Sequence, residues 1–197
     1  MSTPQLLVII CSTRPGRIGK TIGEWFAEAA RTDGTFDVTV ADLAEMNLPF
    51  MDEPNHPRLR KYTKDHTKSW SATVAAADAV VWVQPEYNYA MCAAQANAID
   101  FLFQEWARVA TSFVSYGGVS GGLRGVQHAK GKLTTVQSVY AGNAVMIPMA
   151  ASSVADGVFT PSRQVADSVA PMLAELAELV DLLAPVRSAM RAGMADS

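Results

Sequence analysis

Short apolar runs alternate along the chain with longer segments whose apolar residues recur at helical spacing. Residues 6–11 and 79–83 are continuous apolar runs, typical of strands buried on both faces of a parallel sheet. Three further strands are predicted over residues 36–41, 111–116 and 144–149. The spacing predicts helices over residues 18–30, 59–77, 93–106 and 121–139, and a C-terminal helix with Val169, Leu173, Leu176, Val180 and Leu183 on one face.

Strands that alternate with helices predict right-handed crossovers and three layers, with helices on both faces of a parallel sheet. Five strands in this rhythm fit an α/β flavodoxin-like sandwich with strand order 2-1-3-4-5. In that order the winding reverses between strands 1 and 3. The binding crevice should therefore follow residues 11 and 83, with residue 116 next to it.

Prolines and chain length indicate the domain organisation. Pro49, Pro54 and Pro57 restrict residues 42–57 to a loop with at most one helical turn. Pro171 should open or kink the last helix, and the residues past Pro185 are expected to fray. For 197 residues we expect one domain over residues 1–187 and a flexible tail over residues 188–197.

Composition excludes several classes of protein. Hydrophobic residues make up 49% of the chain, as in folded globular proteins, and the formal net charge is only −3. Without a block of basic residues, that balance argues against a nucleic-acid partner. Two cysteines supply neither a disulfide framework nor a zinc site, and the N-terminal apolar run is too short for a signal peptide or membrane span. We expect a cytoplasmic protein without a metal site and without membrane or nucleic-acid partners.

Residues 12–20 join a buried strand to a helix N-terminus and contain hydroxyls, glycines and two arginines. Backbone N–H groups and the helix dipole at such a junction favour a phosphate, and Arg14 and Arg17 would add charged hydrogen bonds. An ordinary polar turn is the alternative. Gly19-Lys20-Thr21 resembles the end of a P-loop, but Arg14 stands where that loop requires glycine.

Two more strand ends carry unusual loops. Residues 84–91 combine two tyrosines, a proline and an asparagine, which suits an aromatic ring system, although a turn capping a helix has the same composition. Residues 115–122 contain four glycines that allow the backbone to approach a ligand closely.

Other reactive residues carry weaker signals. Residues 118–122 match the G-x-S-x-G of α/β-hydrolases, but His128 follows Ser120 closely, with no acid between them, so no triad is expected. The three histidines lack metal-ligand spacing. Cys92 stands near a helix N-terminus and is expected to be a small apolar filler.

These segments together resemble the NADPH-dependent FMN reductases of the flavodoxin-like superfamily. Residues 12–17 resemble the phosphate loop of that family. Residues 85–89, continuing to 97–100, are similar to its P-E-Y-N flavin motif, and residues 115–118 are similar to its glycine-rich loop. The resemblance covers about residues 5–150. Cys11 departs from it, because the family usually has glycine there, and the departure crowds the entry to the phosphate loop.

The resemblance implies a binding role for three sets of residues. The FMN phosphate would be held by Ser12, Arg14, Arg17, Ile18 and Gly19. The flavin ring would be lined by Pro85, Glu86, Tyr87, Asn88 and Tyr89. Its other edge would meet Ser115, Tyr116, Gly117 and Gly118.

The resemblance also implies an activity. FMN would be bound non-covalently, and NADPH or NADH would donate a hydride to flavin N5 in a ping-pong reaction. A small-molecule electron acceptor would then be reduced: a quinone, a free flavin, an azo compound or a metal oxyanion. No catalytic side chain is implied. A homodimer or homotetramer is expected, with residues 43–57 and 101–106 as candidate contacts.

Two alternatives stay open. One is a flavodoxin-type electron carrier that binds FMN but does not react with NAD(P)H directly; the modest net charge and a basic face formed by Arg58, Arg60, Lys61, Lys64 and Lys68 argue against it. The other is a binding or regulatory module that has lost its flavin, which Cys11 would favour.

Overall fold

The computed structural model describes residues 3–195, with side chains up to residue 192. The strands are β1 (Gln5–Ile10), β2 (Asp37–Asp42), β3 (Ala79–Pro85), β4 (Ala110–Tyr116), β5 (Val139–Tyr140), β6 (Val145–Ile147), β7 (Val154–Ala155) and β8 (Val158–Phe159). The α-helices are α1 (Gly19–Asp33), α2 (Leu43–Met46), α3 (Asp65–Ala76), α4 (Ala93–Asp100), α5 (Leu123–Thr135), α6 (Arg163–Asp167) and α7 (Val169–Ala195). Short 3-10 helices cover Pro57–Leu59, Gln104–Trp106 and Ala150–Ser153.

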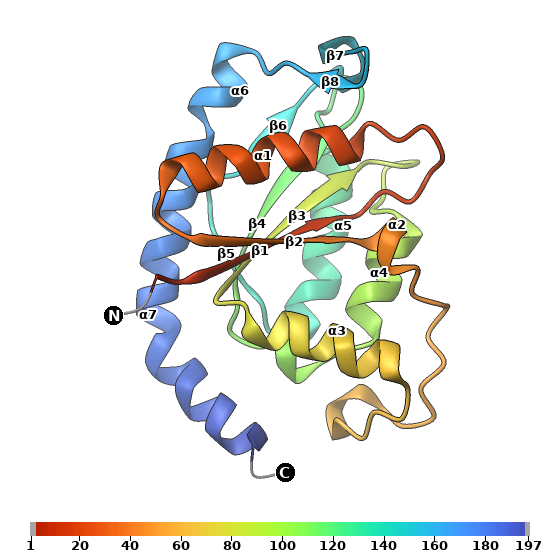
Figure 1. Cartoon of the computed structure of the whole chain (residues 1–197), viewed down its shortest axis with the longest axis vertical. Coiled ribbons are helices and arrows are strands. Elements are labelled where there is room, and N and C mark those ends of the chain that lie inside the picture. The colour runs from red at the N-terminus through yellow and green to blue at the C-terminus, as the bar shows by residue number, and fades with distance from the viewer. Residues whose placement is uncertain (1–2, 196–197) are drawn as a thin grey trace.

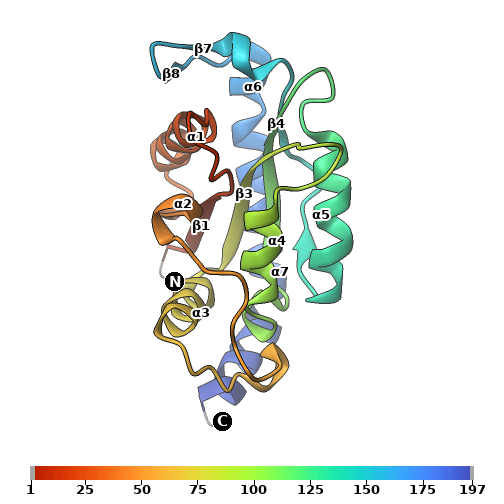
Figure 2. The same ribbon diagram turned by 90° about the vertical axis from the view of Figure 1, so that its right-hand side faces the viewer.

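A parallel sheet in the order β2-β1-β3-β4-β5 forms the middle of the molecule, and this confirms the predicted fold class (Figure 1). Helices α1 and α7 cover one face, and α3, α4 and α5 cover the other (Figure 2). Alternate residues of β1 enter the two cores: Leu6 and Val8 pack toward α1, while Leu7 and Ile9 pack toward α3 and α4. This two-sided burial explains why the central strands are apolar throughout.

The fifth strand differs from the prediction. In place of one strand over residues 144–149, β5 and β6 pair separately with the two ends of β4. The chain bulges between them, and the Glu175 carboxylate of α7 accepts hydrogen bonds there from the backbone N–H groups of Gly142 (2.6 Å) and Asn143 (2.7 Å). A side chain therefore takes the place of strand partners for these two amides.

Three predicted helices are shorter than expected. The helix predicted over residues 121–139 covers only Leu123–Thr135, and Val139 instead begins β5. The helix predicted from residue 59 begins at Asp65, because the Glu53 carboxylate binds the N–H groups of Thr63 and Lys64 and holds them in a loop. The helix predicted to reach residue 106 ends at Asp100, and Phe101 and the rest of that stretch turn inward. Four members of the stretch are almost completely buried: Phe101, Leu102, Glu105 and Trp106. Phe103 and Gln104 are half-buried, and a subunit contact through residues 101–106 stays a prediction.

The C-terminal helix extends further than expected. Pro171 lies in its first turn, and α7 continues past Pro185 to Ala195 instead of fraying. Arg187 is buried and donates hydrogen bonds to the carbonyl oxygens of Ala107 (2.9 Å) and Ala77 (2.8 Å). Flexibility of residues 188–197 stays a prediction, and residues 196–197 lie outside the described part of the chain.

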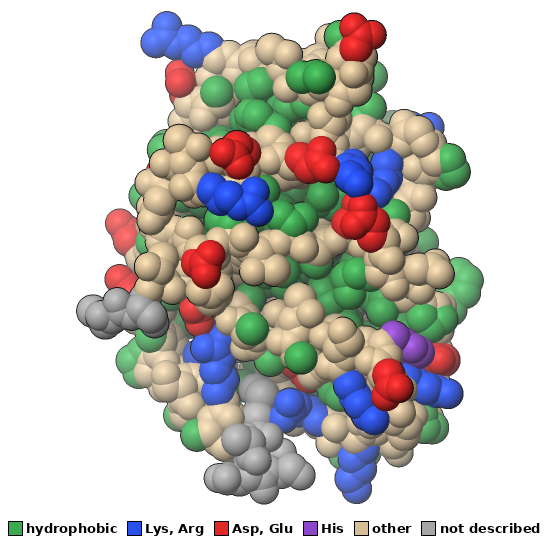
Figure 3. Space-filling model, viewed as in Figure 1, with side chains coloured by type: hydrophobic (Ala, Val, Ile, Leu, Met, Phe, Trp, Pro, Cys, Tyr) green, Lys and Arg blue, Asp and Glu red, His purple; other side chains and the backbone are tan. Residues whose placement is uncertain are grey.

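The surface matches the balanced composition. On the face drawn in Figure 3, acidic and basic side chains are interspersed, with hydrophobic side chains between them. Within residues 3–195, none of the helices combines the length and the apolar character needed to cross a bilayer.

Replacing Glu175 with Gln should lower the free energy of unfolding at pH 7 by about 1–2 kcal/mol, because an amide oxygen accepts the two N–H groups more weakly than a carboxylate does. These hydrogen bonds lower the pKa of Glu175 in the folded protein. Its contribution is therefore present above the unfolded pKa and is lost as the pH falls through the folded pKa. Urea unfolding should show the difference between variant and parent shrinking as the pH is lowered. Glu178→Gln, at an exposed position of the same helix, is the control; an equal effect there would contradict the assignment.

Candidate functional site

Four loops surround a cavity of about 450 Å³ at the carboxyl ends of the central strands. Three of them follow β1, β3 and β4, which lie at one end of the sheet because the strands are parallel (Figure 1). The fourth follows β6. The cavity is lined by Ser12, Arg14, Arg17, Ile18, Pro85, Glu86, Tyr87, Tyr116, Gly117, Gly118, Met149, Ala150, Ala151 and Ser152.

Ten of the fourteen residues singled out from the sequence line this cavity. The other four stand around it. Gly19 begins α1, and Ser115 is buried with its hydroxyl donating to the Gly121 carbonyl oxygen (2.8 Å). Asn88 and Tyr89 form the tip of the second loop. The structure therefore brings the three loops together, while the binding role of each residue stays a prediction.

The loop after β6 is the part that the sequence analysis missed. Met149 donates its backbone N–H to the Gly118 carbonyl oxygen (2.9 Å), and Ala150 donates to Gly117 (3.0 Å), so this loop and the glycine-rich loop form one wall. A proline followed by small residues at a strand end, Pro148-Met149-Ala150-Ala151, was the only available signal.

The first turn of α1 opens toward the cavity without a cap. Ile18 occupies the N-cap position and makes no side-chain cap hydrogen bond, and the first turn contains no acidic residue. The leading backbone N–H groups of a helix carry partial positive charge and accept an anion readily. Gly19 has no room for a side chain, because a Cβ there would lie 2.2 Å from the Tyr116 hydroxyl oxygen.

Arg17 holds the first loop to the sheet. Its two terminal nitrogens each lie 2.6 Å from an Asp42 carboxylate oxygen, and Nη1 also donates to the Ser12 carbonyl oxygen (2.8 Å). The hydrogen bond to Asp42 raises the pKa of Arg17. The contact of Arg17 with a phosphate stays a prediction. Both of its terminal nitrogens already donate hydrogen bonds to groups of the protein. Arg14 is exposed and makes no side-chain hydrogen bond or ion pair with any residue among 3–195.

The second loop is a tight turn. Tyr87 and Ala90 exchange both backbone hydrogen bonds (3.0 Å each), and Asn88 and Tyr89 between them have positive φ angles of 50° and 66°. This is a type I′ geometry, which favours asparagine at its first central position and is uncommon for tyrosine at the second. The Tyr87 hydroxyl lies 2.7 Å from the Ser12 hydroxyl, so the first two loops are directly connected.

Glu86 caps a helix. Its carboxylate accepts hydrogen bonds from the Ser120 hydroxyl (3.0 Å) and from the N–H groups of Arg124 (2.9 Å) and Gly125 (3.2 Å) at the start of α5. Burial alone would raise the pKa of Glu86, but these hydrogen bonds lower it, so the group is a carboxylate at neutral pH. The Arg124 guanidinium, paired with Glu86, stacks 3.8 Å from the centre of the Tyr89 ring.

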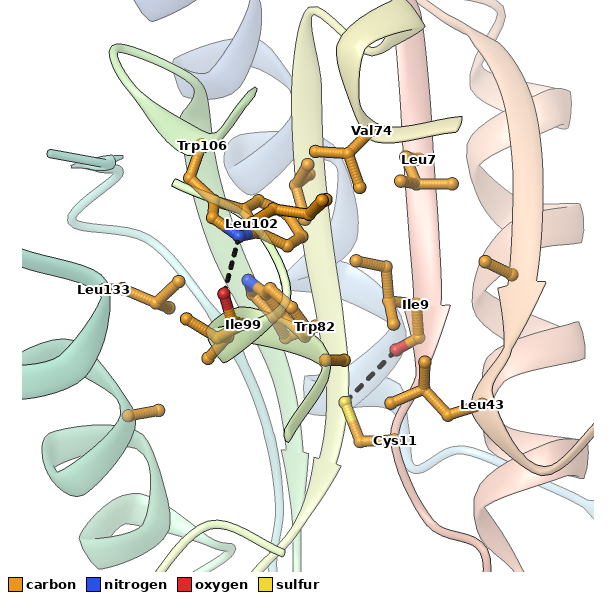
Figure 4. Close-up of a cluster of buried hydrophobic side chains, with 14 of the residues drawn as sticks. Leu7, Ile9, Cys11, Leu43, Val74, Trp82, Ile99, Leu102, Trp106 and Leu133 are labelled. Atoms are coloured by element: carbon orange, nitrogen blue, oxygen red, sulfur yellow. Dashed lines mark hydrogen bonds between the residues drawn. The ribbon is translucent and has the colours of Figure 1, made fainter. Parts of the chain in front are cut away.

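The two cysteines are free and buried. Burial raises the pKa of both thiols, so neither is poised as a thiolate. This confirms Cys92 as an apolar filler. The Cys11 sulfur points toward the Ile9 carbonyl oxygen inside the core shared by α3 and α4, beside Leu43 (Figure 4). Cys11 therefore lies behind the first loop and does not line the cavity.

The rejected hydrolase interpretation also fails in the structure. Ser120 donates its hydroxyl to Glu86, whereas His128 accepts a hydrogen bond from the Met91 backbone N–H (3.4 Å). Serine and histidine are thus bonded to different groups, and no nucleophile–base pair forms between them.

Comparison with known proteins places the chain among flavin reductases. Residues 4–152 match the family model described as NADPH-dependent FMN reductase. An NAD(P)H-dependent FMN reductase of Schizosaccharomyces pombe is 40% identical over 122 residues, which cover 61% of this chain and 61% of that protein. One from a Nectria species is 29% identical over 171 residues, covering 81% and 85%. The chain thus spans less than two thirds of the S. pombe relative.

Solved structures share the fold. FerB of Paracoccus denitrificans, a flavoenzyme NAD(P)H:(acceptor) oxidoreductase, superposes with a TM-score of 0.69 over 90% of this chain and 97% of its own, at 19% identity. At that identity the likeness concerns the fold alone.

Replacing Gly19 with Ala should lower the free energy of unfolding by about 1–3 kcal/mol, because the new methyl group overlaps the buried Tyr116 hydroxyl. Gly131→Ala is the matched control, since nothing lies within 4 Å of a Cβ at that position in α5. The control should be stabilised by about 0.5–1 kcal/mol through helix propensity. Denaturant unfolding of both variants tests the prediction, and a Gly19→Ala protein as stable as the parent would contradict it.

Proposed function

Because the chain belongs to the NADPH-dependent FMN reductase family, we propose that it binds FMN non-covalently and reduces a small-molecule acceptor with NADPH or NADH. The relatives from S. pombe and Nectria are named NAD(P)H-dependent FMN reductases, and the proposal extends that activity to this protein. FMN binding would occupy a single domain over residues 1–187.

The open N-terminus of α1 is the observation that carries the proposal. Its N-cap residue, Ile18, lines a cavity of about 450 Å³, a size within the usual range for small-ligand sites, and the absence of a Cβ at Gly19 leaves room for the Tyr116 hydroxyl beside the first turn. A phosphate at this point would meet N–H groups, the Ser12 hydroxyl and the exposed Arg14. The residues present therefore fit a phosphorylated cofactor.

In this proposal the loops after β3 and β4 contact the flavin ring. Pro85 and Tyr87 supply flat surface for the flavin ring, and the backbone of Gly117 and Gly118 meets its edge. The Ser12–Tyr87 hydrogen bond keeps the phosphate loop and the ring platform at a constant separation. Glu86 and Arg17 would hold the loops in position and not contact the cofactor with their charges. The Glu86 carboxylate is bonded to the start of α5 and to Arg124, and the Arg17 guanidinium is bonded to Asp42.

The cofactor would supply the redox chemistry: when bound, FMN takes a hydride from the nicotinamide and passes reducing equivalents to the acceptor. The protein would bind and orient the reactants and exclude water from one side of the site. In this proposal no side chain lining the cavity acts as a general acid or base; the lining residues bind and orient the reactants. Quinones, flavins, azo compounds and metal oxyanions remain the proposed acceptors.

We also propose that the protein is a cytoplasmic homodimer or homotetramer. Support comes from large apolar side chains exposed in the long loop after β2: Phe50 is 86% exposed and Leu59 is 59% exposed. Side chains of this kind are favoured in contacts between subunits. The two free, buried cysteines agree with a reducing compartment.

The proposed activity predicts the outcome of an anaerobic titration. The FMN-reconstituted protein should lose its visible flavin absorbance on addition of NADPH and regain it when a quinone is added. A bound flavin that NADPH and NADH leave oxidised would contradict the reductase and favour an electron carrier. Failure of the protein to bind FMN would exclude both.

Replacing Arg14 with Ala should weaken FMN binding by about 1.5–3 kcal/mol, because one charged hydrogen bond to the phosphate is lost. Fluorescence titration of the flavin measures the affinity directly. Arg31→Ala, at the exposed far end of α1, is the control and should bind FMN as the parent does. Equal affinities for the Arg14 variant and the parent would exclude Arg14 from the phosphate site.

A further inference from the structure

Tyr116 has a buried hydroxyl group that the folded chain does not use. It is the last residue of β4, its side chain is 5% exposed, and its oxygen makes no hydrogen bond of standard geometry within the described part of the chain, although the Ser12 hydroxyl lies close enough to lower its pKa. Leaving a buried hydroxyl without a partner costs free energy, so such groups are rare unless a ligand or water satisfies them.

The position of this hydroxyl is unexpected. The family resemblance assigns residues 115–118 to the edge of the flavin ring. The phenol instead reaches the first residue of α1: a Cβ built on Gly19 would lie 2.2 Å from the hydroxyl oxygen and 3.3 Å from the Ser12 Cβ. The group therefore lies beside the first residue of a 15-residue helix whose N-cap makes no side-chain hydrogen bond.

Two independent observations thus coincide at one point: uncapped helix amides and an unpartnered, buried donor that lines the same cavity. We propose that the Tyr116 hydroxyl donates a hydrogen bond to the phosphate of FMN and thereby distinguishes FMN from riboflavin. This inference rests on the proposed function, and it adds one neutral side chain to the residues expected to hold the phosphate.

Among the neighbouring groups, Arg14 is exposed and has no side-chain partner within residues 3–195, and a buried neutral donor would add to its contact with the phosphate. Arg17 is paired with Asp42 at 2.6 Å and brings little net charge to the site. The Ser12 hydroxyl is already bonded to Tyr87. Burial raises the pKa of Tyr116, so the phenol keeps its proton and can donate a hydrogen bond at neutral pH. A phosphate has several acceptor oxygens, which helix amides and the phenol can share.

The test compares two ligands and two variants. Apo-protein is titrated with FMN and with riboflavin, and flavin fluorescence gives each Kd. Tyr116→Phe removes only the oxygen. Tyr140→Phe is the matched control, because the Tyr140 hydroxyl donates to the Lys130 carbonyl oxygen (2.8 Å) near the other end of the sheet.

For Tyr116→Phe we expect FMN binding to weaken about 10-fold to 100-fold, as for loss of a hydrogen bond to a charged group, with riboflavin binding unchanged. The apo variant should melt at the same temperature as the parent or higher, because the lost oxygen had no partner. Tyr140→Phe should show the reverse pattern: a lower melting temperature and an unchanged Kd for FMN.

Three outcomes would overturn the inference. Equal weakening of FMN and riboflavin would place the hydroxyl on the ribityl chain or the ring. Unchanged FMN affinity would exclude any contact, and a lower melting temperature of the apo variant would show that the hydroxyl stabilises the fold. These results are distinct from failure of the proposed function, in which the parent protein itself would bind neither flavin.

Discussion

The reversal of winding at β1 is the constraint on which the site depends. β1 pairs with β2 on one side and β3 on the other, and the helices that follow β1 and precede β3 pack on opposite faces of the sheet. No crossover can then cover the carboxyl ends of β1 and β3. Both loops at those ends stay open, and the cavity forms between them.

Charged residues at the site mainly build its walls. Arg17 fastens the first loop to the end of β2 through Asp42, and Glu86 fastens the second loop to the start of α5. In the pairs Arg17–Asp42 and Arg124–Glu86 the opposite charges neutralise each other, so these groups present little net charge to a ligand. Apart from Arg14 and the paired Arg17 and Glu86, the cavity is lined by glycine and other backbone, aromatic rings, hydroxyls and small or aliphatic side chains, and the bonds between its loops hold the site rigid before binding.

Two residues at the rim of the cavity have an unfavourable backbone conformation. Tyr89 and Met149 both have positive φ angles, 66° and 49°, which side chains other than glycine and asparagine seldom adopt. Each is fixed by backbone hydrogen bonds next to it, from the Tyr87–Ala90 pair and from Gly118. Strain of this kind persists only where the surroundings impose it, and it is common around ligand sites. The rim is therefore held in place by the same bonds that join the loops.

The sequence by itself determined the layers, the strand order and three of the four loops. Continuous apolar runs such as residues 79–83 can only be strands buried on both faces, and their order fixes where the carboxyl ends meet. These patterns involve residues that are close in the sequence, so they can be recognised without knowing which distant segments pack together.

Only the tertiary structure decided what individual side chains do. The bonds of Arg17 to Asp42, of Glu175 to the split fifth strand and of Met149 to Gly118 join residues far apart in the chain. The hydroxyl of Tyr116 lies against Gly19 for the same reason. No periodicity encodes such contacts, because they depend on how close the packed elements bring the two partners.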